Sequence, residues 1–214
     1  MMHNIKGKER VENFGEVNTS AKEIDGILDM LVNEVNRVDS KFYEPACGDG
    51  NFLTEILKRK INFIEAKYKK NKNSFQRNLF LIVCNLYGVD ILQDNIFICR
   101  ERLLNILKDT CYRNLKNCSY EKLIDSMKFV ISKNILWGDA LTLERVDSQT
   151  PIIFSEWSFV NKNLVKRINY KLSSIVESEF ILDTPLFSDL GEDVYMPSPV
   201  KVFELQNYLD LKDV

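Results

Sequence analysis

The residues best suited to chemistry lie in one short segment, EPACGDGNF, from Glu44 to Phe52. It combines two carboxylates, Glu44 and Asp49, with two of the chain's eight glycines, Gly48 and Gly50. Glycine lacks a Cβ and tolerates left-handed backbone, so a ligand can lie against such a turn. The pattern is not G-x-G-x-x-G, and Asp49 would repel a pyrophosphate. The segment therefore favours a ligand with a positive centre, the alternative being an ordinary tight turn with solvated acids.

A strand and a helix must position this segment. Residues 40–43, SKFY, are extended and half apolar, and the residues after the turn place apolar side chains at helical spacing. These apolar residues are Phe52, Leu53, Ile56 and Leu57. A glycine turn between the first strand and its helix, at the carboxyl edge of a parallel sheet, is where nucleotides usually bind. We therefore expect the ligand at that edge.

Strands and helices alternate along the rest of the chain. A capping box from Ser20 to Glu23 begins a helix that we expect to pack on the sheet. Further helices are predicted at 74–85 and 95–107, strands at 86–91, 127–131, 134–138 and 151–154, and a strand with a helix within 163–177. Repeated βαβ units predict an α/β fold with a doubly wound, mainly parallel sheet covered by helices on both faces. The Pro- and Gly-containing segment 184–199 is expected to be a surface arm.

Length and composition indicate one globular domain. The chain has 214 residues, of which 45% are hydrophobic and 28% charged, with a net charge of −2. We divide it into an N-terminal helical cap (1–40), a cofactor-binding core (41–160) and a reduced C-terminal part (161–214). Neither a membrane-spanning helix nor a signal peptide is predicted, so we expect a cytoplasmic protein. Five irregularly spaced cysteines and a single histidine, His3, favour neither a zinc site nor a disulfide framework.

Basic residues are concentrated between Lys58 and Arg77, where eight bases face the single acid Glu65. Aromatic residues stand among them, which suits contact with nucleic-acid phosphates. The residues we expect to bind nucleic acid are Lys67, Lys69, Lys70 and Lys72. A solvated helix face is the alternative.

The glycine segment resembles the first motif of the adenine-N6 DNA methyltransferases of restriction-modification systems, D/E-P-A-C-G-S/D-G-x-F. Other segments resemble that family's motifs in the family's order, and together they cover roughly residues 13–143. They are FGEVNTS (14–20), YGVDI (87–91) and NILWGDAL (134–141). The resemblance implies a Rossmann-like methyltransferase fold, truncated at its C-terminal end, with S-adenosylmethionine as the cofactor.

The resemblance also implies a set of cofactor-binding residues. Asp90 is expected to accept hydrogen bonds from the ribose hydroxyls and Asp139 from the adenine amino group, whereas the residues alone also allow a cap or turn role for each. Thr19 matches the family's cofactor-contacting Thr, although its neighbours Asn18 and Ser20 depart from the family pattern. The full set is Thr19, Glu44, Pro45, Ala46, Cys47, Gly48, Asp49, Gly50, Phe52, Asp90 and Asp139.

The catalytic motif of the family, N/D/S-P-P-Y/F/W, is absent from this chain. SEWSF (155–159) stands in its place, where Ser155 and Glu156 could accept hydrogen bonds from a target amine and Trp157 or Phe159 could stack on a flipped base. The alternative is a strand end with a core tryptophan. Since 55 residues follow Phe159 in this sequence, we expect them not to include a target-recognition domain.

Two functions follow from the resemblance. The first is an S-adenosylmethionine-binding, DNA methyltransferase-like protein that needs a partner chain for activity. The second is a non-catalytic binding or regulatory protein of restriction-modification or phage defence that keeps the fold. DNA and a second polypeptide are the expected partners, and both functions remain open on the sequence alone.

Overall fold

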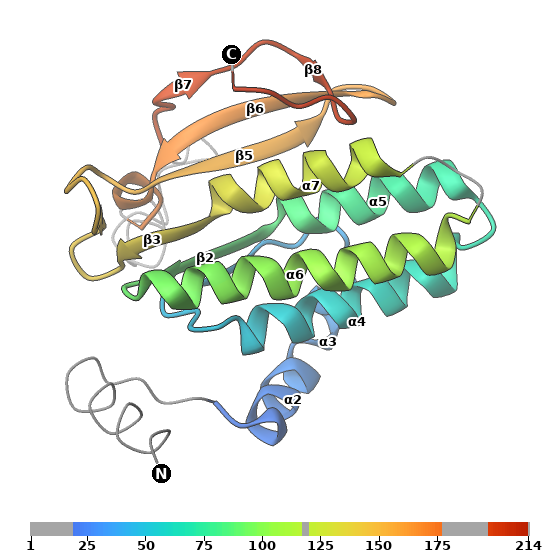
Figure 1. The fold of residues 1–214 in the computed structure, drawn as a ribbon, viewed down its shortest axis with the longest axis horizontal. Helices are drawn as coiled ribbons and strands as arrows, with labels where there is room; N and C mark the ends of the chain where they lie inside the picture. Colours follow the sequence, from blue (N-terminus) through green and yellow to red (C-terminus); the bar gives the residue numbers. More distant parts are fainter. Residues whose placement is uncertain (1–18, 117–119, 177–196, 214) are drawn as a thin grey trace, which may run out of the picture.

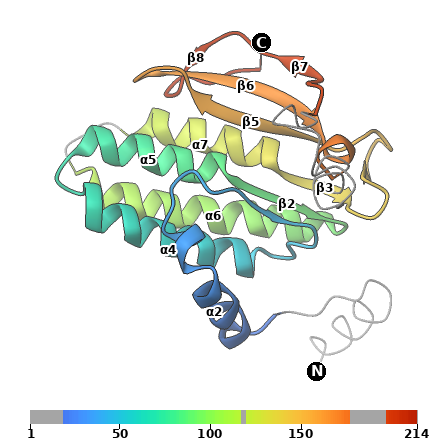
Figure 2. The same cartoon turned by 180° about the vertical axis from the view of Figure 1, so that it is seen from behind.

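The computed structural model describes residues 19–116, 120–176 and 197–213 of the chain (Figures 1 and 2). The helices are α2 (Ala21–Met30), α3 (Val32–Val35), α4 (Asn51–Tyr68), α5 (Lys72–Cys84), α6 (Gln93–Asn114) and α7 (Glu121–Asn134). The strands are β1 (Phe42–Glu44), β2 (Leu86–Asp90), β3 (Ile135–Asp139), β4 (Glu144–Arg145), β5 (Ile153–Phe159), β6 (Leu164–Lys171), β7 (Lys201–Val202) and β8 (Gln206–Asn207). The chain is a mixed α/β protein, as its alternating patterns predict.

The first sheet has the order β1-β2-β3-β4 and is mainly parallel. β1 and β3 both pair in parallel with β2, whereas β4 is antiparallel to β3. Glu44 lies beside Gly88 and Asp90 beside Trp137, so the carboxyl ends of the three parallel strands meet at one edge. Each parallel connection contains two helices, α4 with α5 and α6 with α7 (Figure 1).

The four long helices pack together and cover one face of this sheet. Leu86 and Ile135 point from the strands into the large core that the helices fill. Tyr87, Val89 and Leu136 point to the opposite face, where they form a smaller core with Ile152, Phe154 and Leu172. The first residues of β5 and the short helical segment 172–176 cover the second face, where Leu172 and Ile175 pack. Among the described residues the long helices therefore lie on one face, and the second face has only this short helical segment.

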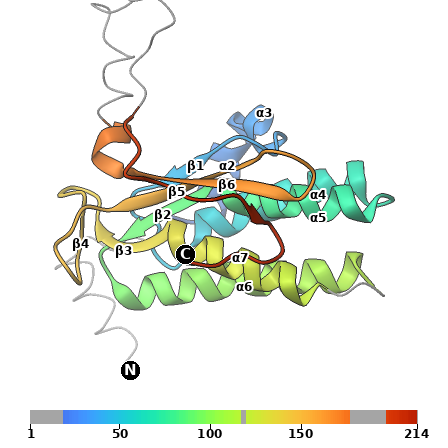
Figure 3. The same ribbon diagram turned by 90° about the horizontal axis from the view of Figure 1, so that it is seen from above.

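β5 and β6 form a separate antiparallel sheet, to which β7 and β8 add short strands. This sheet lies against α5 and α7 (Figures 1 and 3). Its helix-facing side chains explain the position, since the Trp157 ring contacts Phe129 and the Phe159 ring contacts Phe80, at centroid distances of 6.0 and 5.8 Å. β5 thus pairs with β6 rather than extending the parallel sheet.

Two further expectations are corrected. The segment 127–131, predicted as a strand, belongs to α7, because its buried residues Met127, Val130 and Ile131 are spaced for a helix. The capping box at Ser20 is present, with the Glu23 carboxylate accepting from the Ser20 N–H at 2.9 Å. However, α2 packs on α4 rather than on the sheet. Residues 184–196 of the predicted arm lie outside the described residues.

Candidate cofactor site

The glycine segment forms a left-handed turn between β1 and α4. Gly48 has φ +51° and Gly50, the residue before α4, has φ +88°. A Cβ on Gly50 would lie 2.6 Å from Cys99 Sγ, whereas one on Gly48 would meet nothing within 4 Å. Gly50 therefore lets the turn pack on α6, and Gly48 leaves the backbone open to a ligand.

Asp90, at the end of β2, holds this turn in place. Its Oδ2 accepts from the Gly48 N–H at 2.8 Å, and its Oδ1 accepts from the Leu92 N–H at 2.9 Å and from Asn95 Nδ2 at 3.2 Å. An ionised carboxylate offers about four acceptor positions, so three are used within the protein. Asp90 thus positions the loop and retains one position for a ligand donor.

Glu44 is the electrostatically unusual residue of the site. The pKa of its carboxyl is raised to about 7, mainly by burial and also by the charges of Asp90 and Asp49. Its Oε2 is buried and has no hydrogen-bond partner among the described residues. Since a buried unsatisfied polar group costs about 1–3 kcal/mol, a cationic donor placed here would relieve both the missing bond and the repulsion.

Asp49 carries a charge that another side chain compensates. Its carboxylate pairs with Arg102 of α6 at 2.9 Å, and Arg102 also donates to the Asp49 carbonyl and to Asn51 Oδ1, both at 2.9 Å. The repulsion of a pyrophosphate expected from Asp49 is therefore weakened by the Arg102 charge. Arg102 was missed because it stands 53 residues away.

The other expected cofactor residues do not all face the glycine loop in the same way. Asp139 ends β3 at the same sheet edge, and its Oδ1 accepts from the Leu141 N–H at 2.8 Å, which is the turn role that the sequence left open. The Cys47 N–H donates to the Val89 carbonyl at 2.9 Å, while Pro45 and Ala46 are exposed in the loop. Phe52 packs partly against the main core. Thr19 is exposed, and among the described residues no hydrogen bond joins it to the loop.

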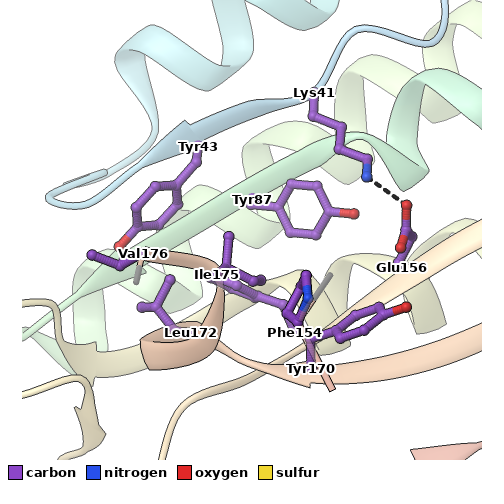
Figure 4. Close-up of a pocket in the computed structure, with 10 residues that line it drawn as sticks. Lys41, Tyr43, Tyr87, Phe154, Glu156, Tyr170, Leu172, Ile175 and Val176 are labelled. Atoms are coloured by element: carbon purple, nitrogen blue, oxygen red, sulfur yellow. Dashed lines mark hydrogen bonds and ion pairs between the residues drawn. The ribbon is translucent and has the colours of Figure 1, made fainter. Parts of the chain in front are cut away.

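The structure separates the three residues expected to be catalytic. Ser155 is buried, donating to Asn169 Oδ1 at 2.8 Å and accepting from Arg167 Nε at 3.0 Å. Trp157 is buried on the same side of β5. Glu156 points to the opposite side, where it pairs with Lys41 (Figure 4). Because neighbouring strand residues face opposite ways, Glu156 does not share a surface with Ser155 and Trp157, which both belong to the core.

A pocket of about 560 Å³ lies on the Glu156 side of β5 (Figure 4). The described residues that line it come from β1, β2, β5, β6 and the chain around them. They are Lys41, Tyr43, Tyr87, Phe154, Glu156, Tyr170, Leu172, Ile175, Val176 and Pro197. Sequence reasoning missed this pocket, because four different strands each contribute one aromatic residue to it.

The predicted basic stripe is divided into two parts. Lys60 is buried and donates to the Ser40 carbonyl at 3.1 Å, and Arg59 pairs with Asp25 and Asp29 of α2. The lysines expected to bind nucleic acid surround the turn between α4 and α5. We call Lys67, Lys69, Lys70 and Lys72 the basic end cluster. Since α4 has 18 residues and rises about 1.5 Å per residue, this cluster lies about 27 Å along α4 from the glycine loop.

Comparison of the chain with protein-family models, with curated proteins and with solved structures found no match. Within the described ranges, no helix combines the length and apolar character that crossing a membrane requires. The site itself therefore provides the basis for a functional proposal.

Proposed function

We propose that the glycine loop and Asp90 bind S-adenosylmethionine and that the fold is a Rossmann-like methyltransferase fold. The chain would then act as a DNA methyltransferase-like protein related to adenine-N6 methylation, with a partner chain required for activity. The observation that carries the proposal is the hydrogen bond between the Gly48 N–H and Asp90 at 2.8 Å, which joins the open glycine turn to the acid ending the next strand.

The chemistry of the loop supports a cationic cofactor. S-adenosylmethionine carries a sulfonium and an α-amino group, and the buried Glu44 Oε2 would accept from the amino group. The remaining acceptor position of Asp90 suits a ribose hydroxyl. Gly48, without a neighbour where its Cβ would stand, leaves space for the ligand against the backbone.

The proposed need for a partner rests on the directions in which the β5 side chains point. Chemistry on adenine requires an extruded base held by acceptors and an aromatic face. Ser155 and Trp157 are buried against the helices, and Glu156 faces the other way. The same observation favours the second candidate function, a non-catalytic binding or regulatory protein of restriction-modification or phage defence.

Isothermal titration with S-adenosylmethionine tests the cofactor proposal. Asp90→Asn keeps the shape of the side chain but removes its charge. A hydrogen bond to a charged group contributes about 1.5–3 kcal/mol, so we expect a roughly 10- to 150-fold loss of affinity for S-adenosylmethionine. Asp125→Asn, at an exposed position of α7, is the control. Unchanged affinity in Asp90→Asn, or no binding by the unaltered chain, would contradict the proposal.

A methyl-transfer assay separates the two candidate functions. Transfer of labelled methyl to DNA only after a second polypeptide is added would support the methyltransferase subunit. Cofactor binding without transfer under any pairing would favour the binding protein. Transfer by the purified chain alone would contradict the requirement for a partner.

A further inference from the structure

The pocket beside Glu156 has an electron-rich aromatic lining. The Phe154 ring meets Tyr43 and Tyr87 edge to face, at centroid distances of 5.7 and 5.2 Å. Tyr170 also lines the pocket, and Leu172 provides an apolar surface (Figure 4). A volume of about 560 Å³ is typical of a small-molecule site. Aromatic faces carry partial negative charge and attract cations, so the lining favours a positively charged ligand with an apolar body.

The charged groups of the pocket also favour a positively charged ligand. Among the described lining residues these are Glu156 and Lys41, which form an ion pair. The Glu156 charge acts on its aromatic neighbours, because after burial it is a further cause of the raised pKa of both Tyr87 and Tyr170. The carboxylate that pairs with Lys41 therefore lies close enough to these tyrosines for its charge to act on them.

Lys41 is the more readily displaced member of this pair. Its side chain is 54% exposed, compared with 37% for Glu156, which is fixed on a strand paired along its length. An exposed ion pair contributes only about 0–1 kcal/mol, so Lys41 can turn into water at little cost. Binding an anion to Lys41 would instead leave the Glu156 charge unpaired beside the rings. The lysine ammonium therefore marks the position that a ligand cation would take.

We propose that this pocket binds an organic cation with an aromatic or apolar body, whose amine replaces Lys41 on Glu156 while its body lies against Tyr43, Phe154 and Tyr170. This site is separate from the glycine loop. Tyr43 directs its ring into the pocket, whereas the adjacent Glu44 takes part in the carboxylate group around Asp90. The inference goes beyond the proposed cofactor function and does not depend on it.

Tryptamine and indole-3-acetate are matched probes, because they share an indole ring and carry opposite charges. Titration followed by calorimetry and by NMR of the protein should show tryptamine binding at least about tenfold more tightly, a difference of about 1.4 kcal/mol. Glu156→Gln should weaken tryptamine binding about tenfold or more. Lys41→Met should strengthen it severalfold, because the internal competitor is removed. Lys58→Met, which breaks an ion pair with Glu55 on α4, is the matched control and should change nothing.

The opposite effects of the two ion-pair variants are the decisive result, since damage to the fold would weaken binding in both. Equal affinity for the two indoles, weaker tryptamine binding in Lys41→Met, or no binding at millimolar concentration would overturn the proposal. Asp90→Asn should leave tryptamine binding unchanged. If S-adenosylmethionine displaces tryptamine and responds to Glu156→Gln but not to Asp90→Asn, the pocket inference stands and the proposed cofactor site is wrong.

Discussion

Replacing Glu44 with Gln is expected to stabilise the protein at pH 8. At pH 5 the same substitution should have a much smaller stabilising effect. The folded state raises the pKa of this carboxyl from 4.5 to about 7, so between these values it holds a proton that the unfolded chain has released. Stability is therefore lost as the pH rises through this window, and the loss is complete above it. This pKa difference between the folded and unfolded states lowers the free energy of unfolding by about 3 kcal/mol at pH 8 and by less than about 1 kcal/mol at pH 5. Because Glu44 is partly exposed, we expect Gln to recover about 1–3 kcal/mol at pH 8.

Urea unfolding at the two pH values measures this effect. Glu204→Gln, at an exposed position of the C-terminal segment, is the control and should show no such pH dependence. The Glu44→Gln variant should also bind S-adenosylmethionine more weakly, because it loses the charge that attracts the amino group. Greater stability with weaker binding is the signature of a residue retained for a ligand. Equal stabilisation at pH 5 and pH 8, or none at pH 8, would refute the reasoning.

Three other expectations concern packing and charge. Gly50→Ala should lower the free energy of unfolding by about 1–3 kcal/mol, since its Cβ would meet Cys99 Sγ at 2.6 Å, and Cys99→Ala should restore part of the loss in a double-mutant cycle measured by urea unfolding. Asp213→Asn removes the 2.7 Å ion pair with the buried Arg167 and should lower the free energy of unfolding by about 1 kcal/mol, given that Asp213 is 57% exposed. Unchanged stability of the variant in urea unfolding would show that this ion pair does not stabilise the fold. If the basic end cluster contacts DNA, changing its four lysines to Gln should reduce the slope of log affinity against log salt by up to about 3–4, and an unchanged slope would leave the cluster as a solvated surface.

Local sequence patterns predicted the parts of the site that are local in the chain. The strand, glycine turn and helix around Gly48 and the strand ending in Asp90 are all present. They could be predicted because glycine conformational freedom and helical periodicity act over a few residues. The segment 127–131 was mistaken for a strand because a short apolar run fits both periods, and the longer spacing across α7 decides for a helix.

The features that were missed depend on contacts between distant segments. Arg102 reaches Asp49 across 53 residues, and Lys41 reaches Glu156 across 115. The pairing of β5 with β6 was missed for a related reason. The alternation of β5 predicts two dissimilar faces but does not specify which strand supplies its hydrogen bonds. That choice depends on the surface that α5 and α7 present to Trp157 and Phe159.

The parallel sheet also determines the order in which the chain can fold. β1 pairs Phe42 with Leu86 and β2 pairs Gly88 with Ile135, so each contact must close a loop of more than 40 residues. Closing such loops costs entropy before any strand pairing repays it, whereas two helices joined by a short turn meet at once. We therefore expect the α4–α5 and α6–α7 pairs to form before the strands pair and to bring the strand ends together. Weakening the α4–α5 contact should slow refolding, whereas weakening β1 should mainly accelerate unfolding.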